Sequence, residues 1–366
     1  MTDKRAQVPQ PYSRQFKQNW DAFRTRMAAW WHDELPTPIV RIPTPKWQWR
    51  PEVLPDDTDW EAHAGDVAAI LRSREGSFAD NTYLSDHAPC YDIGAGHGIG
   101  TFLGCPMEYR RETVWMHPCL ASLDDELDVT RWRTDERWLA YKERVRVLAA
   151  RAAGRYGFGY YLGGVAQALA LMRGDQPLLI EMIERPEAID EWLARLLPEW
   201  FAMAEELEAV MPPRTDGWTL FWLWAPGRAI FAECDVSCNF SPALFRRFVV
   251  PEVQAMARWA PYSMYHLDGP GAIQHIDALL EIPELGVIQW IRGEGSGGAL
   301  DYLPVMRRIL DGGKKLYTEC SCDELEPLLA QLPHKGLLVH VDPCPDPAKV
   351  DHALRVAAKH GADQSY

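Results

Sequence analysis

A histidine and an aspartate two residues apart, His266 and Asp268, end a short apolar segment and are followed by Gly-Pro-Gly. This pattern predicts a strand that ends in a loop, and residues two apart on a strand point to the same side. His266 and Asp268 can therefore converge on one metal ion or one substrate. Imidazole nitrogen and carboxylate oxygen are both ligands of Zn²⁺, which keeps one position open in catalytic sites.

Further candidate residues follow the other apolar segments. Cys344 offers a thiolate, and His266, Asp268 and Cys344 together form a possible zinc ligand set, with Cys320 as a substitute or fourth ligand. The same residues, without a metal, could instead bind substrate through hydrogen bonds. Both interpretations place the functional site at the ends of the strands.

Other side chains at these strand ends predict acid-base chemistry and substrate binding. Asp235 and Glu319 join His266 and Asp268 as catalytic candidates that exchange protons. Gln289 and Trp290 are candidates for orienting the substrate. Two tryptophans in the segment WTLFWLWAPGR, Trp222 and Trp224, lie near the end of a predicted extended strand over 217–223 and could line a pocket.

Short apolar segments mostly alternate with helical patterns along the chain, which predicts a buried parallel sheet covered by helices. Counting the first segment at 38–42, eight strands are expected, and a (β/α)8 TIM barrel fits them better than a doubly wound sheet. Residues 37–366 then form one barrel domain, and residues 1–36 a helical, tryptophan-containing N-terminal arm. The other expected strands are 157–162, 217–223, 229–234, 262–267, 286–290, 315–319 and 336–341.

Composition excludes several functions. The net charge of -14 argues against a nucleic-acid partner, which needs a basic surface. No apolar run approaches the roughly 20 residues that span a bilayer, and no signal peptide is recognised, so a cytoplasmic protein without a membrane partner is expected. The eight cysteines are then expected to be thiols or ligands rather than a disulfide framework.

A glycine-rich segment supports a competing fold. Residues 91–100, YDIGAGHGIG, look like the nucleotide-binding loop of methyltransferases that use S-adenosylmethionine. Such a loop should open a long helix, whereas Gly104 and Pro106 interrupt the residues that follow. Asp92 and His97 are instead expected on a loop over the mouth of the barrel.

The segment YHLDGPGAIQHIDALLEIPELGVIQW resembles the uroporphyrinogen decarboxylase superfamily, in its decarboxylase-like branch related to corrinoid-dependent methyltransferases. The segments 160–189, 231–253 and 312–325 are similar to further units of that superfamily, so the resemblance covers roughly residues 90–360. It implies a (β/α)8 barrel. The Arg-Gln-Ala-Gly-Arg motif of the porphyrinogen decarboxylases is replaced here by IVRIPTPKWQW.

The resemblance also implies a cofactor and a partner. The related methyltransferases carry a zinc motif, His-x-Cys with a distal Cys, which His266 and Cys344 match while Asp268 replaces the first Cys. The methyl carrier would be methylcobalamin or another corrinoid. It would be free or held by a separate corrinoid protein, since the chain has no Asp-x-His-x-x-Gly motif.

These observations predict a zinc-assisted methyltransferase or demethylase that is linked to a corrinoid and acts on a small molecule. One alternative is a metal-independent decarboxylase or other lyase for a small carboxylated substrate. Another is a barrel that binds a small molecule without catalysis.

Overall fold

The centre of the protein is a seven-stranded sheet in the order β2-β1-β13-β12-β11-β10-β9. The computed structural model describes residues 16–17, 19–45, 58–94, 98–111, 113–213, 217–293 and 295–362. Six strands of the sheet are parallel, and β2 is antiparallel to β1 at one edge. The strands are β1 (Ile39–Pro45), β2 (Asn81–Ser85), β9 (Ala229–Glu233), β10 (Tyr262–Asp268), β11 (Val287–Ile291), β12 (Lys315–Cys320) and β13 (Leu337–Val341).

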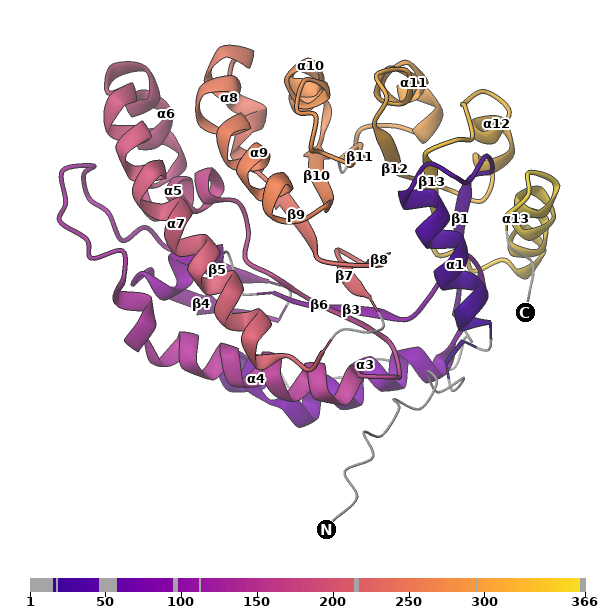
Figure 1. The fold of residues 1–366 in the computed structure, drawn as a ribbon, viewed down its shortest axis with the longest axis horizontal. Coiled ribbons are helices and arrows are strands. Elements are labelled where there is room, and N and C mark those ends of the chain that lie inside the picture. Colours follow the sequence, from indigo (N-terminus) through magenta and orange to yellow (C-terminus); the bar gives the residue numbers. More distant parts are fainter. Residues whose placement is uncertain are drawn as a thin grey trace, which may run out of the picture.

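Helices cover the outside of the curved sheet (Figure 1). Several begin where the sequence offers a capping side chain: Asp135 accepts from the backbone N–H of Arg137, and Asp346 from that of Ala348. The helices are α1 (Trp20–Trp31), α2 (Trp60–Gly65), α3 (Val67–Asp80), α4 (Glu136–Ala152), α5 (Val165–Arg173), α6 (Asp175–Glu184), α7 (Pro186–Val210), α8 (Pro242–Phe248), α9 (Val250–Trp259), α10 (Ile276–Leu280), α11 (Leu303–Asp311), α12 (Leu325–Leu329) and α13 (Pro347–Lys359). In the described residues, none of them is long and apolar enough to cross a membrane.

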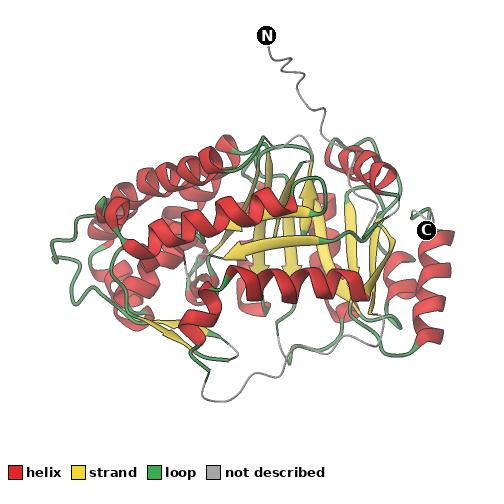
Figure 2. Cartoon of the chain, turned by 90° about the horizontal axis from the view of Figure 1, so that it is seen from below, coloured by secondary structure: helices red, strands yellow, loops and turns green. Residues whose placement is uncertain are grey.

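The remaining strands form three small sheets. A parallel pair joins β3 (Cys90–Gly94) to β6 (Gly157–Tyr161), and one hairpin joins β7 (Trp218–Leu220) to β8 (Leu223–Ala225). A second hairpin joins β4 (Met107–Tyr109) to β5 (Val114–Met116). Strand β7 contacts both β6 and β9, so the β7–β8 and β3–β6 pairs continue the line of strands beyond β9, whereas the β4–β5 hairpin lies apart from the central sheet (Figure 2). The expected mixed α/β architecture is confirmed.

The strands of the central sheet present different side chains on their two faces. Residues paired in register point to the same side, and the pairing places Tyr317, Gln289, His266 and Glu233 in one row. Val339, Leu316, Ile288 and Tyr265 alternate with polar residues and lie buried in the apolar core under the helices. The face that carries His266 is therefore polar toward the carboxyl ends of the strands, and the other face packs against the helices.

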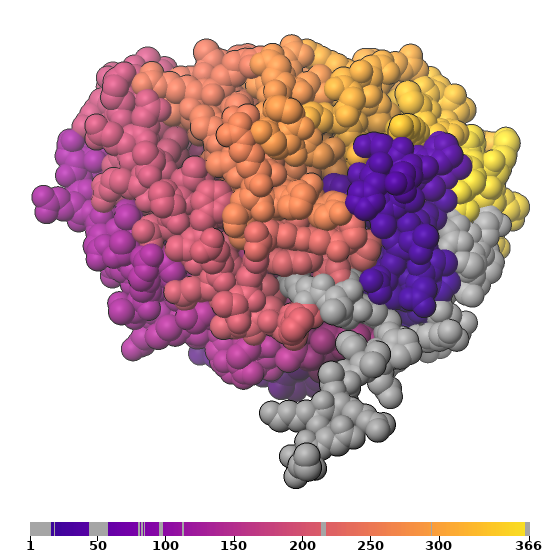
Figure 3. Space-filling model, in the orientation of Figure 1, coloured from indigo at the N-terminus to yellow at the C-terminus, as the bar shows by residue number. Residues whose placement is uncertain are grey.

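Helix α1 packs against the amino ends of the strands. Its buried side chains share an apolar cluster with Met264, Val287 and Leu338. The Trp31 indole N–H donates to the backbone oxygen of Trp224 over 2.9 Å. Figure 3 shows the exposed side of α1 in indigo. Residues 1–15 of the expected arm lie outside the described residues.

Two expectations about individual segments are wrong. The extended strand expected over 217–223 is broken by a turn, because Phe221 and Trp222 both have positive φ, 42° and 60°. Asp92, expected on a loop over the mouth of the barrel, lies in strand β3, whereas residues 98–102 form only a short 3-10 helix, as the interruption by Gly104 and Pro106 predicts. His97 lies outside the described residues.

Candidate metal centre at the strand ends

Asp235, His266 and Asp268 come together at the carboxyl ends of two neighbouring strands. One ligand atom from each lies within 4.8 Å of the others, a spacing that suits a shared metal ion. His266 pairs in register with Glu233, so these two residues lie on the same side of the sheet; Asp268 follows on that side of β10, and Asp235 begins the 3-10 helix just after β9. His266 is half-buried and Asp235 exposed, so a ligand can reach the group from the surface.

Two short 3-10 helices position Asp235 beside β10. The first, η3 (Asp235–Asn239), packs against the second, η4 (Pro270–His275). The His275 Nε2 lies 2.8 Å from the Ser237 carbonyl oxygen, to which it donates a hydrogen bond. A side chain at Gly271 would lie 3.2 Å from Cys238, so the Gly-Pro-Gly segment permits this close packing.

Gln289 fixes the orientation of His266. The Nδ1 of His266 lies 2.7 Å from the Oε1 of Gln289, and because this oxygen only accepts, Nδ1 carries the proton. In the neutral imidazole, Nε2 then has the lone pair that can bind a metal. Gln289 is fully buried, and its Nε2 has no hydrogen-bond partner within the described ranges. Gln289, expected to orient the substrate, orients His266 in the structure.

Glu233 is a site residue that the sequence did not single out. Burial, followed by the charges of Asp235 and Asp268, raises the pKa of its carboxyl group to about 8. A protonated carboxylic acid therefore lies beside the candidate ligands at neutral pH. Glu233 and Asp235 are two residues apart, as His266 and Asp268 are. This repeated spacing is the sequence signal that could have revealed Glu233.

Glu319 lies on the same polar face, at the end of β12. Burial and then the charge of Asp342 raise the pKa of its carboxyl group, while the charges of Arg41, Arg292 and His266 lower it. The proximity to His266 makes Glu319 a second group that can exchange protons near the candidate metal ligands.

The expected thiolate ligands lie elsewhere. The Cys344 Sγ contacts the Asp346 carbonyl oxygen at 3.9 Å, and its thiol also lies beside Cys322. Cys320 is fully buried in the apolar core. Within the described residues, the group of possible ligands contains Asp235 and not the expected Cys344.

Two phenylalanines face His266. The ring centroids of Phe231 and Phe221 lie 5.5 and 5.7 Å from that of His266, and the two phenyl rings stack on each other. Phe221 and Trp222 hold positive φ without being glycine, a strained arrangement costing on the order of 1–3 kcal/mol per residue. Asp92 supports the turn by accepting the Trp222 backbone N–H at 2.8 Å.

The three tryptophans expected near the substrate occupy different surroundings. Trp222 is 46% exposed and its ring contacts that of Phe221 at a tilted angle, so it lies next to the site. Trp224 is buried against α1, where its ring contacts Phe23. Trp290 is buried on the helix side of the sheet against Tyr302, because its neighbour Gln289 occupies the polar side.

No protein-family model matches the chain, and no curated protein matches it either. Its function must therefore be inferred from the chemistry of the site. The group Asp235, His266 and Asp268 suits a divalent cation, and Glu233 and Glu319 beside it suit proton transfer.

Proposed function

We propose that this protein is an enzyme that transfers a methyl group between a small molecule and a corrinoid, assisted by a divalent metal ion bound by Asp235, His266 and Asp268. The convergence of these three residues is the observation that carries the proposal. Gln289 adds the hydrogen bond that metal-binding histidines usually make through their second nitrogen.

The donor set is one nitrogen and two carboxylate oxygens, and Zn²⁺ is the proposed ion. Catalytic zinc sites commonly use three protein ligands of these types and leave a fourth position for substrate. Carboxylates in place of thiolates make the site harder, so Mn²⁺ is the principal competitor. When bound, the metal lowers the pKa of a coordinated thiol or alcohol and so favours the nucleophilic anion.

The strand arrangement supports a closed (β/α)8 barrel as the finer description of the fold. The central sheet curves inside its helices (Figure 1), and β7 lies between β6 and β9. In such a barrel the carboxyl ends of the strands build the active site, where Asp235, His266 and Asp268 are found.

The choice of methyl transfer is supported by the resemblance of residues 90–360 to the decarboxylase-like branch related to corrinoid-dependent methyltransferases. The corrinoid would arrive free, as methylcobalamin, or on a separate corrinoid protein. Glu233, whose carboxyl group has a pKa raised to about 8 by burial and by the charges of Asp235 and Asp268 in the metal-free protein, would give a proton to a departing oxygen. Phe221 and Phe231 would exclude water beside His266.

A metal-independent decarboxylase is the second candidate. Its support is the pair of carboxyl groups with raised pKa, Glu233 and Glu319, on the face that carries His266. Either acid can protonate the carbon from which carbon dioxide departs. In this version Asp235 and Asp268 would bind the substrate through hydrogen bonds.

The test is demethylation of methylcobalamin, followed by its absorbance change, with zinc-loaded protein and a panel of thiols and alcohols. The proposal expects turnover by the wild type and by the surface control Asp277→Asn, and loss of turnover in His266→Ala. Turnover that persists in His266→Ala would contradict it. Carbon dioxide release by metal-free protein would favour the decarboxylase, and binding without any turnover would favour a non-catalytic barrel.

A further inference from the structure

Two cysteines outside the candidate metal centre lie close together. The Sγ atoms of Cys105 and Cys119 are 3.1 Å apart, and the two residues flank the β4–β5 hairpin. A disulfide has a sulfur separation of about 2.05 Å, so the bond would require an approach of only about 1 Å. Both thiols are free in the structure; Cys105 is fully buried and Cys119 half-buried.

The backbone holds both cysteines in place. The N–H groups of Cys119 and Leu120 each donate to the Met172 carbonyl oxygen of α5 over 2.9 Å. The Cys105 carbonyl oxygen accepts from Arg137 Nη1 at 2.9 Å. The two thiols are therefore kept facing each other by contacts on either side.

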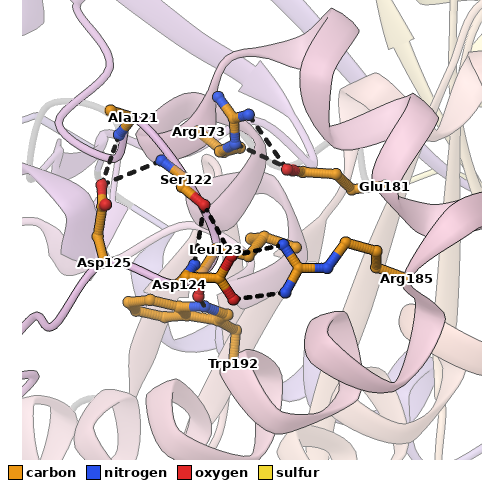
Figure 4. A network of polar contacts seen from close by, with 9 residues as sticks. All are labelled: Ala121, Ser122, Leu123, Asp124, Asp125, Arg173, Glu181, Arg185 and Trp192. Carbon is orange, nitrogen blue, oxygen red and sulfur yellow. Dashed lines mark hydrogen bonds and ion pairs between the residues drawn. The ribbon is translucent and has the colours of Figure 1, made fainter.

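The residues that follow Cys119 are anchored to the helices (Figure 4). The Trp192 indole N–H donates to the Leu123 carbonyl oxygen at 2.9 Å, and Asp124 forms an ion pair with Arg185. Asp125 accepts from the backbone N–H groups of Ala121 and Ser122. These contacts fix the chain downstream of Cys119, so side-chain rotation rather than loop movement would bring the sulfurs together.

The surroundings give the two thiols different reactivity. Contact with the Cys105 thiol, followed by the charges of Arg131 and Arg137, lowers the pKa of Cys119. Contact with Cys119, followed by burial, raises the pKa of Cys105. The thiolate is the nucleophile in thiol–disulfide exchange. Cys119, which is also the more accessible of the two, is thus the residue that attacks first.

We propose that Cys105 and Cys119 form a redox site that closes reversibly to a disulfide by exchange with a low-molecular-weight disulfide. The Cys119 thiolate attacks one sulfur of the external disulfide, whose other half leaves as a thiolate. Cys105 then loses its proton and attacks the Cys119 sulfur, releasing the second half. Two protein thiols are oxidised and one external disulfide is reduced to two thiols.

Peptide mapping tests this site directly. Trypsin cuts after Arg110 and Arg111, which separates Cys105 from Cys119. Reduced full-length protein would be treated with oxidised glutathione, alkylated and digested without reductant. The expected result is a peptide pair joined through Cys119, which disappears after treatment with dithiothreitol.

Two variants complete the test. Cys238→Ser removes an exposed cysteine and should leave the cross-link unchanged. Cys105→Ser should abolish it and leave glutathione on Cys119. Cys90 shares the tryptic peptide of Cys105, so a cross-link that survives in Cys105→Ser would overturn the assignment. Wild-type protein in which Cys119 stays alkylated, or keeps bound glutathione, would overturn it as well.

Discussion

The Nδ1 of His266 and the Oε1 of Gln289 are 2.7 Å apart on neighbouring strands of the sheet. This contact sets the protonated nitrogen of the imidazole and leaves the other nitrogen for a metal ion. The arrangement joins two residues that are 23 positions apart in the chain. Because β10 and β11 pair with His266 opposite Gln289, the register of these strands determines which nitrogen of the imidazole faces the site.

Removal of this contact should weaken metal binding without unfolding the protein. Gln289→Leu has similar volume and removes a side chain whose Nε2 is unpaired among the described residues. Loss of a hydrogen bond behind a metal-binding histidine typically lowers affinity 10–100-fold. Calorimetric titration with Zn²⁺ would measure the change. Gln289→Glu, which keeps an acceptor for Nδ1, is the matched control and should bind more tightly than Gln289→Leu.

The two tryptophans of the β7–β8 hairpin region should respond differently to truncation. Trp224→Ala removes a ring packed against α1 and should cost about 3–5 kcal/mol of the free energy of unfolding. Trp222→Ala removes a half-exposed ring and should change that free energy by less than about 0.5 kcal/mol. Urea denaturation would compare them. Equal losses in the two variants would contradict the described packing.

Glu252 should make the protein less stable as pH rises. Burial raises the pKa of its carboxyl group to about 8, against the hydrogen bond from the Ala166 backbone N–H. Between the unfolded pKa of about 4.5 and about 8, the unfolded chain releases this proton while the folded chain keeps it. Stability is therefore lost progressively across that window.

The isosteric variant Glu252→Gln should flatten this dependence. Its free energy of unfolding should exceed that of the wild type by up to a few kcal/mol at pH 8 and approach it near pH 4, since one pKa unit corresponds to about 1.4 kcal/mol. Denaturant titrations of metal-free protein at several pH values would measure the difference. A constant difference between the two proteins at all pH values would argue against a raised pKa.

Much of the architecture follows from periodicity in the sequence. The apolar segments at 262–267 and 315–319 became β10 and β12, because short apolar runs between helical patterns have few alternatives to buried parallel strands. The turn at Phe221 and Trp222 escaped prediction because such turns usually contain glycine or asparagine. Its geometry depends on contacts with Asp92 and Phe231, which are remote in sequence.

The candidate site was predictable only in part. His266 and Asp268 share a face because of their spacing alone, whereas the arrival of Asp235 depends on the packing of η3 against η4. Alternation along β11 already implies that adjacent residues Gln289 and Trp290 face opposite sides, so both could not line one pocket. Asp235 follows the end of β9 by two residues and Cys344 the end of β13 by three, so a position just after a strand does not by itself identify the third ligand.

The metal content of four purified proteins would show which residues bind the ion. Wild type, Asp235→Asn, His266→Ala and Cys344→Ala would be loaded with Zn²⁺, desalted and subjected to elemental analysis. Ligation by Asp235, His266 and Asp268 predicts about one zinc per chain in the wild type and in Cys344→Ala, with zinc lost from the other two. Zinc that is retained in Asp235→Asn and lost from Cys344→Ala would contradict the account and restore the thiolate as the third ligand.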